Sequence, residues 1–144
     1  MIELTARAII EKDGKFLLVQ LKDQDYWCLP GGRLEKDEPI VDALERELFE
    51  ELGVKLEIGK LLFIHQLFGK DEQRLEFFFH VPYDEKLNFF DITKSSHGSK
   101  ELETAEFIAL NGVHLLPAFL IDELPKMQEK NFIVDVEFKS SMLN

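Results

Sequence analysis

The sequence lacks the features that mark several classes of protein. Its single cysteine, Cys28, excludes an internal disulfide framework and a cysteine-rich zinc site. No apolar run reaches the roughly 18 residues that a membrane-spanning helix needs, and residues 1–10 have neither the basic start nor the small-residue cleavage site of a signal peptide. These absences predict a cytoplasmic protein without a membrane partner.

Positive charge is scarce as well. The 144 residues include 28 acidic residues against 17 lysines and arginines, which gives a formal net charge of −11. Nonspecific binding of nucleic acid needs a basic face, so nucleic acid is not an expected partner, and a polyanionic ligand would need bridging metal ions. Hydrophobic residues make up 45% and charged residues 31%, a globular composition, and the length predicts one domain over residues 1–144.

Hydrophobic periodicity predicts an α+β domain with a mixed sheet. Alternating apolar residues indicate strands, and Asp13-Gly14 between two such runs is typical of a hairpin turn. Gly53 is suited to end the first helix, whereas Pro125 is expected to end or kink the second. Strands are expected at residues 2–10, 15–21, 60–68, 74–83, 106–110 and 133–138, and helices at 39–52 and 115–128.

The first predicted helix carries a dense cluster of acids. Glu47, Glu50 and Glu51 are spaced i, i+3 and i+4, so they occupy one stripe beside the stripe of leucines that packs inward. Like charges at this spacing repel one another, and clustered carboxylates are the ligands that Mg²⁺ and Mn²⁺ prefer. For these three residues alone, the alternative of an ordinary solvent-exposed acidic helix face stays open.

The surrounding sequence favours the metal site. Residues 32–54 read GRLEKDEPIVDALERELFEELGV, and this segment resembles the Nudix box G-x5-E-x7-R-E-U-x-E-E-x-G-U, in which U is aliphatic. All nine fixed positions match across 23 residues. The preceding WCLPGG at residues 27–32 is similar to the lead-in common in that family, and EFIAL at residues 106–110 is similar to its late strand.

The resemblance implies a Nudix fold, an α/β/α sandwich around a central mixed sheet. It also implies a metal-dependent hydrolase that cleaves a phosphoanhydride bond in a nucleoside diphosphate linked to another moiety. Mg²⁺, or Mn²⁺ in its place, would be bound by Glu47, Glu50, Glu51 and the backbone carbonyl of Gly31. Glu47 would also orient or deprotonate water. Arg46 would hold a box carboxylate in place, and Glu38 would support the start of the helix.

A further acid is implied in the loop before the late strand, where some family members place an additional metal ligand or base. Glu101 is five residues before Glu106 and is the expected residue, with Glu103 as its rival and a solvated loop acid as the alternative. The catalytic group expected from the resemblance is therefore Glu47, Glu50, Glu101 and Arg46. Cys28, Trp27, His65 and His80 are expected to be structural.

The substrate is expected to be a small nucleotide, with nucleoside triphosphates, nucleotide sugars and ADP-ribose all open. The polar residues 84–103 are where we expect specificity, because binding loops commonly carry it. Two other functions stay open: an RNA 5′-end pyrophosphohydrolase and a non-catalytic Nudix-like nucleotide-binding module. The oligomeric state also stays open, with a homodimer as one option.

Overall fold

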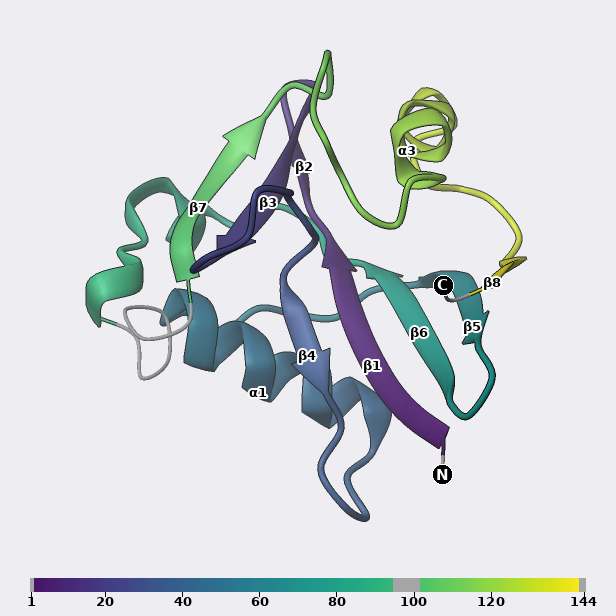
Figure 1. Cartoon of the computed structure of the whole chain (residues 1–144). Coiled ribbons are helices and arrows are strands. Elements are labelled where there is room, and N and C mark those ends of the chain that lie inside the picture. The colour runs from purple at the N-terminus through teal and green to yellow at the C-terminus, as the bar shows by residue number, and fades with distance from the viewer. Residues whose placement is uncertain (1, 95–101, 143–144) are drawn as a thin grey trace.

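The computed structural model describes residues 2–94 and 102–142. Figure 1 shows helices and two groups of strands, with 3₁₀ turns in the connection that follows the sixth strand. In chain order the elements are β1 (Ile2–Ile9), β2 (Glu11–Lys12), β3 (Lys15–Leu21), β4 (Gly31–Arg33), α1 (Ile40–Leu52), β5 (Leu61–Phe68), β6 (Gln73–His80), η1 (Glu85–Phe89), η2 (Ile92–Lys94), β7 (Leu102–Ile108), α3 (Leu120–Glu129) and β8 (Glu137–Met142).

The strands form two sheets. The larger has the order β4-β1-β6-β5-β8 and is mixed, because β1 is parallel to β6 and β5 is parallel to β8 while the other neighbours are antiparallel. The smaller sheet, β2-β3-β7, is antiparallel. The helices α1 and α3 pack against different core clusters, so the predicted α+β class with a mixed sheet is confirmed.

The core has one layer under each helix. In β6, Phe79 joins the α1 layer, whereas Phe78 points to the α3 layer, as period-2 alternation requires. Small residues in β1 let α1 approach the sheet closely. The α1 layer contains Ala6, Ala8, Leu44, Leu48 and Leu52, and the α3 layer contains Ile9, Phe63, Leu120, Leu124 and Met127.

The box helix has the predicted bounds to within one residue. Pro39 precedes the first turn, and Gly53 ends the helix in the left-handed conformation at φ 75°, where its N–H donates to the carbonyl of Phe49. Asp13 and Gly14, with φ of 52° and 82°, form the predicted turn between β2 and β3. Local turn and cap residues therefore fix this half of the chain.

The C-terminal half departs from the predicted bounds. β7 begins at Leu102 because residues 102–105 pair with the end of β3, a contact that local sequence does not reveal. α3 begins at Leu120 and continues past Pro125 to Glu129. The last strand is displaced to Glu137–Met142, where it pairs with β5. No helix among residues 2–94 and 102–142 is long and apolar enough to cross a membrane.

Leu48 tests the packing of α1. Its side chain is fully buried, so Leu48→Ala is expected to lower the free energy of unfolding by about 2–5 kcal/mol. Val41 lies on the same helix but is 39% exposed, and Val41→Ala is the matched control, with an expected loss below about 1 kcal/mol. Denaturant unfolding measures both, and equal losses would contradict the assignment of Leu48 to the core.

Candidate active site

The box acids lie together at one cavity. A hollow of about 440 Å³ is bordered by β4, by the adjoining loop and by the acidic face of α1. Glu47, Glu50 and Glu51 all line it, and so do Gly31 and Arg46. The structure therefore brings together every site residue expected from the sequence except Glu101, which lies outside the described residues. Glu103, its rival, is exposed on β7.

Two glycines give the carboxylates their space. Gly31 has a φ of 139°, and a Cβ at this position would lie 2.0 Å from the carbonyl oxygen of Ala6 in β1. A Cβ on Gly32 would lie 2.4 Å from the carboxyl carbon of Glu47. Gly31 thus permits the close pairing of β4 with β1, whereas Gly32 leaves room for a functional side chain.

Arg46 ties the acidic face to the loop before the helix. Its Nε and Nη2 donate to the two carboxylate oxygens of Glu38 at 2.8 and 3.0 Å, a bidentate pair. Its Nη1 donates to Glu47 at 3.0 Å and to Glu50 at 3.1 Å. One guanidinium therefore offsets the repulsion among three carboxylates.

These contacts shift the ionisation of the partners. The hydrogen bonds that Arg46 donates to Glu38, followed by those to Glu47 and Glu50, raise the pKa of Arg46 well above its ordinary value even though burial opposes the shift. The hydrogen bond from Arg46 lowers the pKa of Glu38, with a smaller contribution from the N–H of Glu35. Both groups stay charged near neutral pH, so the ion pair between Arg46 and Glu38 persists at that pH.

Glu51 is the buried member of the acidic stripe. Its side chain faces the sheet, and one carboxylate oxygen accepts a hydrogen bond from the N–H of Gly31 at 3.0 Å. A carboxylate buried in this way needs such partners, because desolvation penalises the charged form. The contact joins the middle of the site to the first residue of β4.

The donor atoms in this cavity suit a hard divalent cation. The carboxylates of Glu47, Glu50 and Glu51 offer only oxygen, the donor type that Mg²⁺ and Mn²⁺ take. Among residues 2–94 and 102–142, however, no three acidic, histidine or cysteine side chains are grouped tightly enough to hold a metal as they stand. Arg46 contacts Glu47 and Glu50 through one nitrogen, so a cation would have to draw both carboxylates from it.

The comparison with known proteins identifies the family of this chain. The profile of the NUDIX domain matches residues 2–127. The chain belongs to the Nudix family. Members of this family generally use divalent metal ions, which agrees with the oxygen donors of the cavity.

Three relatives show how far the likeness extends. The CTP pyrophosphohydrolase of Escherichia coli K12 is 47% identical over 70 residues, which cover 46% of this chain and 51% of that protein. The phosphatase NudJ of the same strain is 32% identical over 85 residues, which cover 57% of this chain and 56% of that protein. The solution structure of the E. coli ORF135 protein has a TM-score of 0.66 and 27% identity, over 92% of this chain and 95% of that one. The chain thus spans about half the length of the curated relatives it matches.

Sequence analysis missed three charged residues that line this cavity, Arg7, Arg33 and Glu35. Arg7 stands opposite Gly31 in the pairing of β1 with β4, and its Nη1 donates to the carbonyl of Leu29 at 3.3 Å. A signal for Arg7 was present, since it is a charged residue between Ala6 and Ala8 in a predicted strand, and both alanines are buried.

Cys28 and His80 lie in surroundings that suit a structural role. Burial raises the pKa of the Cys28 thiol, which disfavours the thiolate needed for nucleophilic attack. Burial lowers the pKa of His80, whose ring stacks on that of Phe132 at 4.2 Å between centroids. His65 differs from these, because its ring is fully buried and hydrogen-bonded to Glu76.

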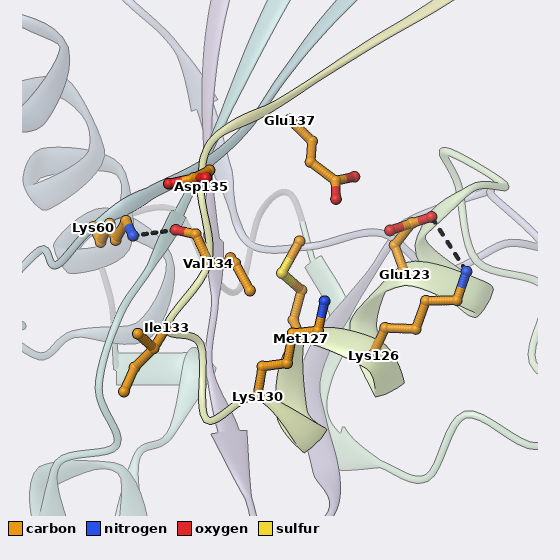
Figure 2. Close-up of a pocket in the computed structure, with 9 residues that line it drawn as sticks. All are labelled: Lys60, Glu123, Lys126, Met127, Lys130, Ile133, Val134, Asp135 and Glu137. Atoms are coloured by element: carbon orange, nitrogen blue, oxygen red, sulfur yellow. Dashed lines mark hydrogen bonds and ion pairs between the residues drawn. The ribbon is translucent and has the colours of Figure 1, made fainter.

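Figure 2 shows a separate cavity of about 460 Å³ between α3 and residues 133–137. It shares no lining residue with the cavity of the box acids. Its charged groups engage the chain itself, since Lys60 donates to the carbonyl of Val134 and Glu123 pairs with Lys126 at 3.7 Å. We therefore attribute it to the docking of the C-terminal segment and not to the Nudix site.

The two glycines can be separated by experiment. Gly31→Ala is expected to lower the free energy of unfolding by about 3 kcal/mol or more, because the new Cβ meets backbone and the φ is unfavourable. Gly32→Ala meets only the end of the Glu47 side chain, so its expected loss is below about 1 kcal/mol. Its binding of Mn²⁺ should instead weaken about tenfold or more. Denaturant unfolding and calorimetric titration measure the two effects, and an intact Mn²⁺ affinity in Gly32→Ala would contradict the placement of Glu47.

Proposed function

We propose that this chain is a metal-dependent Nudix pyrophosphohydrolase that cleaves a phosphoanhydride bond in a nucleoside diphosphate linked to another moiety. The observation that carries the proposal is the convergence of Glu47, Glu50 and Glu51 on one cavity walled by Gly31 and Gly32. A chain with 28 acidic residues repels a polyphosphate unless cations intervene at such a place. Retention of all the box acids argues against a purely binding module.

Each residue has a distinct part in the proposed reaction. Mg²⁺, with Mn²⁺ as a substitute, would be held by the three glutamates and the carbonyl of Gly31, and when bound it supplies charge neutralisation for the phosphates. Glu47 orients the attacking water or accepts its proton. Arg46 holds the box carboxylate of Glu38 through its bidentate contact and does not touch substrate. Glu101 is proposed as an additional base.

Among the open substrates we favour a nucleoside triphosphate. The E. coli relative that is 47% identical over 70 residues is named a CTP pyrophosphohydrolase, and that match supports the choice. Nucleotide sugars, ADP-ribose and RNA with a 5′ triphosphate belong in the same substrate screen. The phosphate products identify which anhydride is cleaved.

Metal dependence is the first test. Hydrolysis of the best nucleotide in the screen should be absent in excess EDTA and return with Mg²⁺ or Mn²⁺, because the acidic cavity otherwise repels the phosphates. Millimolar metal should also raise the Tm, since it binds the folded state and relieves carboxylate repulsion. Unchanged turnover in EDTA would remove the metal from the mechanism.

The second test separates the acids of α1. Glu50→Gln and Glu51→Gln keep the shape of the side chain but remove one charge each, and each should lower kcat about 100-fold or more with the fold retained. Glu45→Gln is the matched control, because Glu45 is on the same helix but does not line the cavity. Steady-state kinetics at saturating Mg²⁺ measure all three. Full activity in both site variants would mean that neither acid takes part in the reaction.

A further inference from the structure

We propose that a second cavity beside the box acids binds the base of the nucleotide, and that Glu76 selects bases with an amino group next to a ring-nitrogen acceptor. Cytosine and adenine share this edge, whereas uracil and hypoxanthine carry a keto oxygen in place of the amino group. The inference rests on the proposed function, because it assigns the nucleoside end of the same substrate.

The position of the cavity suits the nucleoside end. It measures about 560 Å³ and lies between the sheet and residues 116–118, in the segment that leads from β7 to α3 (Figure 1). Arg7 and Leu21 line both this cavity and the cavity of the box acids. A ligand with its phosphates at the box acids therefore has its base within reach of this second space.

The walls suit a flat ring. Leu29 and Phe78 border the cavity on the side of the core, and Leu116 and Pro117 border it on the side of the loop. Apolar walls with a few well-placed polar groups are typical of small-molecule sites, and stacking against such walls holds a base without selecting one. Selection therefore has to come from the polar groups.

Glu76 is a buried carboxylate in this cavity, and packing alone does not explain its presence there. It is 8% exposed and stands on the same face of β6 as Phe78, where most of the surrounding layer is apolar. A buried carboxylate costs stability unless it is partnered. Here His65 Nδ1 lies 3.0 Å from one oxygen of Glu76, and Arg7 Nε lies 3.8 Å from the other.

His65 acts as a positioning residue for this carboxylate. It is 1% exposed, and its Nε2 lies 2.9 Å from the hydroxyl oxygen of Ser141 in β8. The imidazole is thus fixed at both nitrogens, by β6 on one side and by the edge strand on the other. This pairing fixes the direction of Glu76, whose side chain lines the cavity.

The pair of Glu76 and Arg7 presents an acceptor beside a donor. A carboxylate accepts a hydrogen bond from the 4-amino group of cytosine or the 6-amino group of adenine, and the neighbouring guanidinium donates to the adjacent ring nitrogen. The keto oxygen of uracil or hypoxanthine would instead face the carboxylate, acceptor against acceptor. The same two residues therefore attract one class of base and repel the other.

The experiment compares matched pairs of substrates, CTP with UTP and ATP with ITP. In wild-type protein, kcat/KM should be about tenfold or more higher for the amino member of the preferred pair. Glu76→Gln can donate to a keto oxygen, so this ratio should fall about tenfold or more, mainly through KM. His65→Gln should reduce the ratio in the same direction but less. Glu137→Gln, an exposed acid outside this cavity, is the control and should leave the ratio unchanged.

A binding measurement keeps this inference separate from the proposed function. Calorimetric titration with CMP, UMP, AMP and IMP in EDTA needs no metal and no hydrolysis, and it should show the same amino preference and the same loss in Glu76→Gln. Preference for CMP alone or for AMP alone identifies which base fills the cavity.

The outcomes distinguish the two ideas. Absence of hydrolysis with any nucleotide and metal would defeat the proposed function, while the monophosphate series would still test the base cavity. Equal affinity within both pairs, a keto preference, or an unchanged ratio in a folded Glu76→Gln protein would overturn the role of Glu76. If Glu76→Gln fails to fold, Glu76→Asp keeps the charge but withdraws it from the base, and an unchanged ratio there would overturn the role equally.

Discussion

The acidic face of α1 depends on the hydrogen bonds that the guanidinium of Arg46 donates. Glu47 follows Arg46 directly, and Glu50 lies one helical turn after it. Without the guanidinium between them, the negative charges of these two residues would oppose helix formation. Arg46 also holds Glu38, whose carboxylate accepts from the N–H of Glu35 and closes the loop before the helix. One hydrogen-bond network around Arg46 thus joins the helix, the loop before it and the site. The bidentate contact with Glu38 keeps Arg46 in place when Glu47 and Glu50 turn toward a cation.

Strand β1 is the second constraint, because its two faces serve different purposes. Ala6 and Ala8 are small enough for α1 to lie close above them, and the backbone of Ala6 admits Gly31 at a distance that only glycine allows. Arg7, between them, points to the other layer and reaches Glu76 and the carbonyl of Leu29. Alternation along one strand therefore places the phosphate end and the base end of the candidate site side by side.

Sequence predicted the local parts of this structure well. The spacing of the box, with Gly53 as a helix terminator, located α1 to within one residue, and it named the acids that line one cavity. The predicted bounds were wrong where pairing with a distant strand determines where a strand begins. Ile133, Val134 and Val136 are apolar, yet Ile133 is 77% exposed, because the register of β8 on β5 begins at Glu137 opposite Phe63. The start of β7 at Leu102 depends in the same way on β3.

The same distinction explains why the base cavity escaped sequence analysis, which expected specificity in residues 84–103. Arg7, His65 and Glu76 come from three strands, and their meeting requires the parallel register in which Thr5 pairs with Glu76 and the antiparallel register in which His65 pairs with Glu76. No short motif encodes such a meeting. Most residues proposed to act on the phosphates lie in 23 contiguous residues, whereas the proposed choice of base depends on sheet register. On this proposal, substitutions on the strands alter the accepted base while the box acids stay unchanged, since the two cavities share only Arg7 and Leu21.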